Sequence, residues 1–114
     1  MLPQLSGPFQ PAGKTSRLAT SGTTANIALS TPIAGNDAEQ LQIINVSTAV
    51  AYVAFGTNNT VTASAGTSGT STSDYAIAAN ARIVVTPPIG TEWVAIILES
   101  STGEALFTPG AGIT

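Results

Sequence analysis

Residues that could carry acid–base or metal chemistry are scarce in this sequence. Histidine and cysteine are both absent from its 114 residues. Histidine is the side chain that titrates nearest to neutral pH, and together with cysteine it supplies most protein ligands for zinc and copper. A serine nucleophile would have to work without its usual histidine base. These residue types favour a structural or binding role over an enzyme.

Six carboxylates remain as candidates for acid–base catalysis or calcium binding. They are Asp37, Glu39, Asp74, Glu92, Glu99 and Glu104. Paired carboxylates catalyse glycoside hydrolysis, and Glu99 and Glu104 flank a turn at Ser101-Thr102-Gly103 that could bring them together. Carboxylates that bracket a turn are usually just solvated, and the spacing of a calcium-binding loop is missing. We therefore expect no catalytic residues, no metal site and no cofactor.

Gly13-Lys14-Thr15 resembles the end of a phosphate-binding loop. That motif places its first glycine where this chain has Pro8, and Gly7 lies one residue too far upstream. It also needs a strand before it and a helix after it, whereas a proline-rich stretch precedes the triplet here and an expected strand follows it. The spacing therefore argues against nucleotide binding.

Charge is low for a soluble domain. Charged residues make up 8% of the chain, whereas about 25% is typical. The net charge is −3 and the only cations are Lys14, Arg17 and Arg82, so the basic patch needed for nucleic-acid binding is missing. Few charges also mean weak repulsion between copies, and we expect neighbouring subunits to cover much of the surface.

Membrane association is not expected either. The longest strongly apolar stretch, residues 93–98, is far shorter than the roughly 20 residues that span a bilayer. Residues 1–5 have neither the basic start nor the apolar run of a secretory signal. The sequence therefore predicts neither a membrane partner nor a nucleic-acid partner.

The elements that must position these residues are short strands. Strand candidates occur at residues 16–20, 24–30, 41–46, 51–55, 74–78, 81–86, 92–100 and 104–108, and several of them show two-residue alternation. Turn-forming residues separate them, and no segment shows a convincing helical stripe. About eight short strands with such turns predict an all-β fold, a β-sandwich or jelly roll. We assign it to a single compact domain, residues 13–114.

Residues 1–12 are expected to form an extended N-terminal arm. Pro3, Pro8 and Pro11 disfavour a helix there. The arm is either a frayed terminus or a segment that lies on a neighbouring subunit. Leu5 and Phe9 are its candidate interface residues, because an exposed Phe9 would be unfavourable in water.

Residues 57–73 form a Ser/Thr/Gly-rich stretch in which Val61 is the one apolar anchor. Such a composition predicts a flexible or surface loop. A loop of this length in a small domain is either functional or disordered, and the sequence leaves that choice open.

Trp93 and Ile97 are the other candidate interface residues. The run from Trp93 to Leu98 is apolar on both faces of a strand. It belongs either in the middle of a sandwich or in a contact with another chain. Trp93, Tyr52 and Tyr75 are also the aromatic residues that a carbohydrate-binding module would use.

Several motifs, in order along the chain, resemble small virion proteins of tailed bacteriophages and prophages. They are Gly7-Pro8-Phe9-Gln10-Pro11-Ala12-Gly13, Leu41-Gln42-Ile43-Ile44-Asn45-Val46, Val53-Ala54-Phe55-Gly56, Trp93-Val94-Ala95-Ile96-Ile97 and Ala105-Leu106-Phe107-Thr108-Pro109-Gly110-Ala111-Gly112. In these motifs the chain is similar to capsid decoration, or cement, proteins.

This resemblance implies a compact β-sandwich, often jelly-roll-like, on the outside of an icosahedral shell. It implies a homo-oligomer, dimer or trimer, that binds the major capsid protein and braces contacts between its subunits. The implied location is the virion exterior, after synthesis in the bacterial host cytoplasm. A tail, baseplate or head-fibre component would share these features, and a carbohydrate-binding β-sandwich is the alternative from another functional class.

Overall fold

The computed structural model describes residues 9–34 and 38–112 of the chain. These residues contain nine strands and no helix. The strands are β1 (Gln10–Pro11), β2 (Ser16–Thr20), β3 (Ala25–Ala28), β4 (Gln40–Val46), β5 (Ala51–Gly56), β6 (Tyr75–Ile77), β7 (Arg82–Val85), β8 (Trp93–Leu98) and β9 (Gly103–Ala111). The prediction of an all-β fold is confirmed.

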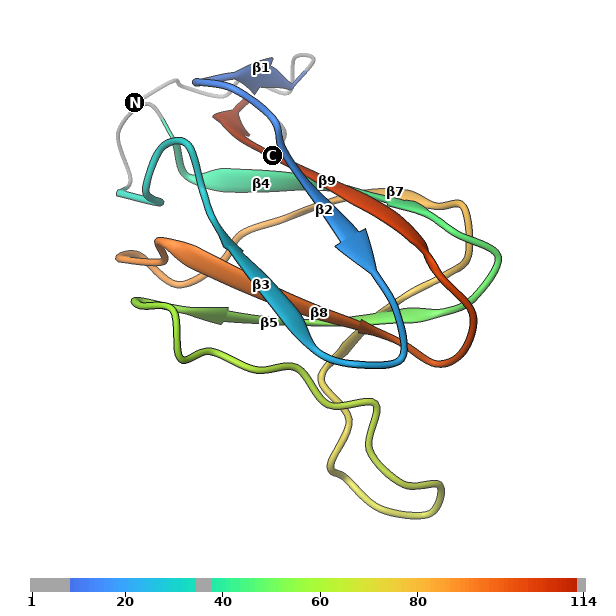
Figure 1. The fold of residues 1–114 in the computed structure, drawn as a ribbon. Coiled ribbons are helices and arrows are strands. Elements are labelled where there is room, and N and C mark those ends of the chain that lie inside the picture. Colours follow the sequence, from blue (N-terminus) through green and yellow to red (C-terminus); the bar gives the residue numbers. More distant parts are fainter. Residues whose placement is uncertain (1–8, 35–37, 113–114) are drawn as a thin grey trace.

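The strands form two antiparallel sheets that face each other (Figure 1). Sheet A has the order β1-β9-β4-β7, with β2 also paired to β9, and sheet B has the order β3-β8-β5-β6. Consecutive strands from β2 onward lie in different sheets, except β5 and β6, which are neighbours in sheet B. The chain therefore winds back and forth between two layers, as a sandwich requires.

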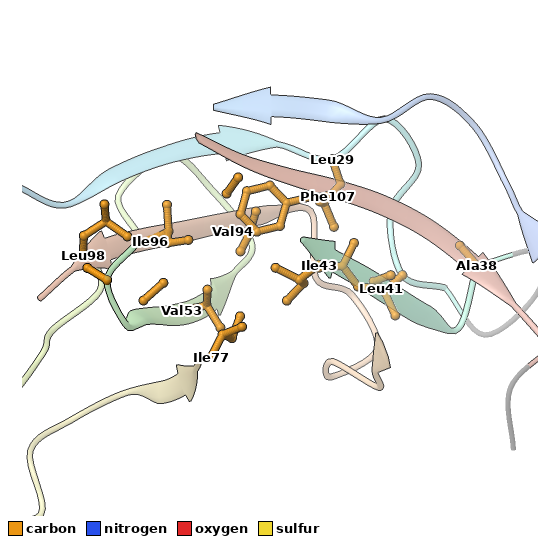
Figure 2. Close-up of a cluster of buried hydrophobic side chains, with 14 residues drawn as sticks. Leu29, Ala38, Leu41, Ile43, Val53, Ile77, Val94, Ile96, Leu98 and Phe107 are labelled. Atoms are coloured by element: carbon orange, nitrogen blue, oxygen red, sulfur yellow. The ribbon is translucent and has the colours of Figure 1, made fainter. Parts of the chain in front are cut away.

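The core lies between the two sheets. Strand alternation sends every second side chain of the central strands inward, and Phe107, Leu41, Ile43, Val53, Ile77, Val94, Ile96 and Leu98 are each at most 1% exposed. Figure 2 shows these side chains converging from β4 and β9 on one side and from β5, β6 and β8 on the other. Burial of this apolar surface is the main force that holds the layers together.

Asn45 of β4 is a fully buried polar residue within this fold. Its amide nitrogen donates to the carbonyl oxygens of Ala49 and Ala78, each at 3.0 Å. Its Oδ1 accepts a hydrogen bond of 2.8 Å from the Ser47 hydroxyl. Because a buried amide is unfavourable without partners, Asn45 ties the β4–β5 connection to the β6–β7 connection.

The last strand is longer than its predicted extent, residues 104–108. A proline usually ends a ladder because it has no N–H to donate, yet β9 continues through Pro109 to Ala111. Carbonyl groups maintain the pairing there: that of Pro109 accepts from the Ala12 N–H at 2.8 Å and that of Gly110 from the Glu39 N–H at 3.0 Å.

The described part of the expected arm lies on this same β9. Gln10 pairs with Ala111 and Pro11 with Gly110. A side chain at position 110 would meet the Phe9 ring at 2.5 Å, so the glycine permits this close approach. The arm's path before Phe9, including Leu5, lies outside the described residues.

Candidate interaction surfaces

The outer face of sheet B carries the interface candidates Trp93 and Ile97. Both lie on β8 with Ala95 between them, and both are half-buried. In the register of the sheet, Trp93 stands opposite Gly56 and Ile97 opposite Tyr52 of β5. Because β8 is an inner strand of sheet B, its inward side chains fill the core. Its outward side chains can be covered only by another segment of the chain or by another molecule.

The chain itself supplies part of that cover. Residues 57–64, which we call the strap, run along the outer side of sheet B (Figure 1). The Asn26 side-chain amide on β3 donates to the carbonyls of Asn59 at 2.9 Å and Val61 at 3.1 Å. The Ala63 N–H donates to Thr24 Oγ1 at 2.9 Å. The first half of the predicted surface loop is therefore bonded to the sheet.

The absence of a side chain at Gly56 lets the strap lie close to β5. A Cβ at Gly56 would come within 2.8 Å of the Val61 Cβ. Ala95, at the centre of the sheet's outer face, has no exposed surface. Val61, the apolar anchor noted in the sequence, thus packs against the end of β5.

Beyond the strap, residues 65–73 form an exposed loop beside Tyr52 and Glu99. The loop and these two side chains enclose a hollow of about 480 Å³. The Tyr52 hydroxyl lies 3.5 Å from Glu99 Oε1. Asp74 closes the base of the loop by accepting a 2.7 Å hydrogen bond from the Ser64 N–H. Aromatic, carboxylate and hydroxyl groups therefore meet at one place.

The outer face of sheet A has a different character. Ile44 of β4 stands opposite Leu106 of β9 in the register, and Val46 and Val84 belong to the same face. Val46 is 46% exposed and the other three are half-buried. We call Ile44, Val46, Val84 and Leu106 the apolar stripe.

An ion pair borders the apolar stripe. Arg17 Nε donates to Glu104 Oε2 at 3.0 Å, and Arg17 Nη2 donates to Glu104 Oε1. These hydrogen bonds lower the pKa of the Glu104 carboxyl and raise the pKa of Arg17. The pair therefore stabilises the fold above the ordinary carboxyl pKa, and that contribution is lost as pH falls through the lowered one. Glu99, which flanks the same turn in the sequence, lies beside Tyr52.

A second hollow, of about 830 Å³, lies between the β1–β2 connection and the outer face of sheet A. Its lining residues are Phe9, Pro11, Gly13, Lys14, Thr15, Gln42, Arg82, Val84 and Thr108. Lys14 and Arg82 are two of the chain's three cations, and no carboxylate is among the described residues that line the hollow. We call it the cationic hollow.

The two candidate faces were visible to different degrees in the sequence. The structure brings Trp93 and Ile97 onto one face, and it places Phe9 in the cationic hollow. Sequence reasoning missed the apolar stripe, although alternation already put Ile44 on the side of β4 opposite to Ile43. The missing information was which other outward residues would become its neighbours.

Within the described ranges, no three His, Cys, Asp or Glu residues gather in a way that could hold a metal ion. Nor do those residues include a helix able to cross a membrane. Comparison of the chain with protein-family models, curated proteins and solved structures finds no match in any of the three. The class that fold and surface define is an all-β, two-sheet protein with a partly exposed apolar sheet face.

Proposed function

We propose that this protein is a structural virion protein that binds the outer surface of a phage capsid and reinforces contacts between major capsid subunits. The sequence motifs described above resemble capsid decoration proteins. The observation that carries the proposal is the apolar stripe on sheet A, because a partly exposed apolar patch marks an interaction site. A tail, baseplate or head-fibre position is the alternative within the same class.

The composition of the sheet A face supports a protein partner. Ile44, Leu106 and Val84 form an apolar centre, while Arg17, Glu104 and Arg82 lie on the same face toward its borders. Protein interfaces have this arrangement of an apolar core and a polar rim. The stripe itself is a sheet surface, and small ligands prefer concave sites.

We further propose that the two sheets form a jelly roll. The support is the pairing pattern: β2 with β9, β3 with β8, β4 with β7 and β5 with β6. Among the eight strands from β2 to β9, the first pairs with the last, and the middle two, β5 and β6, pair with each other. This is the pattern of one long hairpin that is rolled up. Eight strands in two Greek keys define the jelly roll, which recurs in viral capsid proteins and lectins.

The proposed partners occupy different faces. The capsid binds the apolar stripe on sheet A, whereas Trp93 and Ile97 on sheet B contact a sister copy in a dimer or trimer. The N-terminal arm, residues 1–12, adds contacts from its part before Phe9. An oligomer that binds a repeating lattice at several points gains avidity without any new type of contact.

The test is attachment to heads that were assembled without this protein. Purified chain is added, and cryo-electron microscopy measures its occupancy on the shell. We expect wild-type chain at regular lattice positions, and about tenfold weaker attachment for Ile44→Thr/Leu106→Thr, since each change removes buried apolar surface. Ile89→Thr is the matched control, because Ile89 is 79% exposed and lies in the β7–β8 connection.

The result also separates the alternatives. Copies confined to one vertex or to the tail would favour a tail or head-fibre component, and absence of binding to heads would reject the role on the capsid surface. Deletion of residues 1–8 preserves the β1–β9 pairing and tests the arm, with reduced occupancy as the expected result. Unchanged occupancy would reject a role for the arm.

A carbohydrate-binding module is the second candidate, supported by the hollow beside Tyr52 and Glu99. Aromatic rings and hydroxyl-rich loops suit sugar recognition, and Trp93 lies on the same sheet face as Tyr52. A glycan array that shows specific binding, lost in Trp93→Ala or Tyr52→Ala, would favour this function. In either case we propose no catalytic activity, and a hydrolase screen should be blank.

A further inference from the structure

The cationic hollow gathers charge that the rest of the described chain does not neutralise. Arg17, the cation outside it, is bonded to Glu104. Lys14 and Arg82 are both exposed, and no ion pair of either is found among residues 9–34 and 38–112. Both side chains line the same hollow, so an anion bound there would be attracted by each of them. This concentration is notable in a protein whose net charge is −3.

The turn that presents Lys14 is held in place from two sides. Gly13 has a φ of +117°, and a Cβ there would lie 2.5 Å from Thr31 Oγ1 and 2.8 Å from Ser30 Oγ. The Lys14 carbonyl accepts a hydrogen bond from the Ser30 hydroxyl at 2.5 Å. Thr15 is bonded through its hydroxyl to Thr108 on β9 at 2.7 Å. The backbone at Lys14 is therefore ordered before any ligand binds, which lowers the entropic cost of binding.

The other lining groups define the kind of anion. Gln42 can donate from its amide, and a carboxylate accepts such bonds together with those of ammonium and guanidinium groups. Phe9, Pro11 and Val84 add apolar walls. Gln42 lies two residues before Ile44 on β4, and Thr108 lies two residues after Leu106 on β9, all on the same sheet face. The hollow therefore continues into the apolar stripe.

We infer that the cationic hollow receives a carboxylate side chain from an acidic segment of the partner protein, whose neighbouring apolar residue lies on the stripe. The identity of the partner as a capsid protein rests on the function proposed above, whereas the chemistry of the segment rests on the hollow. Charge complementarity selects this occupant, because the described lining residues offer two cations, an amide and hydroxyls but no carboxylate.

A peptide titration tests the chemistry without any capsid. The probe is the N-acetylated, C-amidated pentapeptide Asp-Leu-Glu-Leu-Asp, and its matched control is Asn-Leu-Gln-Leu-Asn. Nuclear magnetic resonance follows the backbone amide signals of the full chain. We expect the acidic peptide to shift the signals of residues 13–15 and 82–84, and the amide peptide to leave them unchanged. Failure of the acidic peptide to bind would overturn the inference.

Variants that change charge inside and outside the hollow locate the effect. Lys14→Gln/Arg82→Gln should weaken peptide binding about tenfold, because each ion pair contributes modestly at an exposed site. Ile89→Glu changes the net charge like either single substitution, but Ile89 is exposed in the β7–β8 connection and belongs to neither the hollow nor the apolar stripe. It should therefore leave the affinity within about twofold. Equal weakening by Ile89→Glu would show a general charge effect and overturn the site assignment.

Two other occupants are distinguishable. Inorganic phosphate that binds at the same signals as tightly as the peptide would overturn recognition of a peptide carboxylate. Self-association that is lost in Lys14→Gln would assign the hollow to a second copy and overturn the acidic partner.

The head-binding assay separates this inference from the proposed function. Wild-type chain that fails to bind heads rejects the capsid-surface role, while the peptide titration still decides the chemistry of the hollow. If Lys14→Gln/Arg82→Gln binds heads as well as the wild-type chain, only the role of the hollow in attachment is rejected.

Discussion

Thr20 and Thr108 show how differently two threonines can contribute to the same sheet. Thr20 of β2 is 2% exposed, and its hydroxyl has no hydrogen-bond partner in the described structure. Thr108 of β9 is 9% exposed, and its hydroxyl is bonded to Thr15. A buried hydroxyl without a partner loses its hydration and gains nothing in return. The same substitution should therefore have opposite effects at the two positions.

We predict that Thr20→Val raises the free energy of unfolding by about 1 kcal/mol, because an isosteric methyl replaces the unpaired hydroxyl. Thr108→Val should lower it by about 1 kcal/mol through the lost hydrogen bond. Chemical denaturation followed by tryptophan fluorescence measures both, with Trp93 as the single reporter. A Thr20→Val variant less stable than wild type would contradict the prediction and indicate an ordered water at that hydroxyl.

At the scale of elements, strand alternation was sufficient to find most of the sheets. Residues 16–20 were predicted as a strand and form β2 with the same bounds. The expected strand at residues 24–30 is shorter in the structure, where β3 covers Ala25–Ala28. Leu29, just beyond β3, still donates its N–H to the Glu92 carbonyl at 2.9 Å, and its side chain enters the core at 8% exposure. Side-chain periodicity reports which face is buried, and it reports less well where backbone pairing stops.

The position of the strap on sheet B could not be predicted from the sequence, for a physical reason. Its bonds to Asn26 use the backbone carbonyls of Asn59 and Val61, and every residue has such a carbonyl. Its close approach at Gly56 depends on the absence of a side chain. Composition alone therefore predicted a flexible or surface loop, and it did not show that part of this surface segment is bonded to sheet B.

Removal of the acceptor at Thr24 should loosen the strap. We predict that Thr24→Val accelerates hydrogen exchange of the Ala63 amide about fivefold, since one hydrogen bond contributes about 1 kcal/mol. Thr24→Ser keeps the hydroxyl and serves as the control, with exchange close to wild type. Equal exchange rates in wild type and Thr24→Val would show that the Ala63 bond does not hold the strap, and the interpretation of residues 57–64 as a cover would fail.

At the scale of the whole molecule, the two sheets present unlike outer faces. Sheet A keeps its apolar stripe partly exposed, whereas the strap covers part of sheet B and leaves Trp93 and Ile97 half-buried. With only 8% charged residues, neither face carries enough charge to prevent association between copies. The candidate surfaces were predictable only in part. The sequence indicated Trp93 and Ile97 on β8, but the apolar stripe on sheet A could be recognised only from the register of β4 against β9.

The last prediction concerns self-association through Trp93 and Ile97. We expect the isolated chain to scatter light as a dimer or trimer at tens of micromolar, on the order of the concentration at which modest apolar contacts form. Ile97→Lys should give a monomer, because a buried ammonium in that contact would be unpaired. Ile44→Lys, on sheet A, should keep the oligomer while weakening attachment to heads. Thermal unfolding checks that both variants fold, and a wild-type monomer at this concentration would refute the sheet B contact.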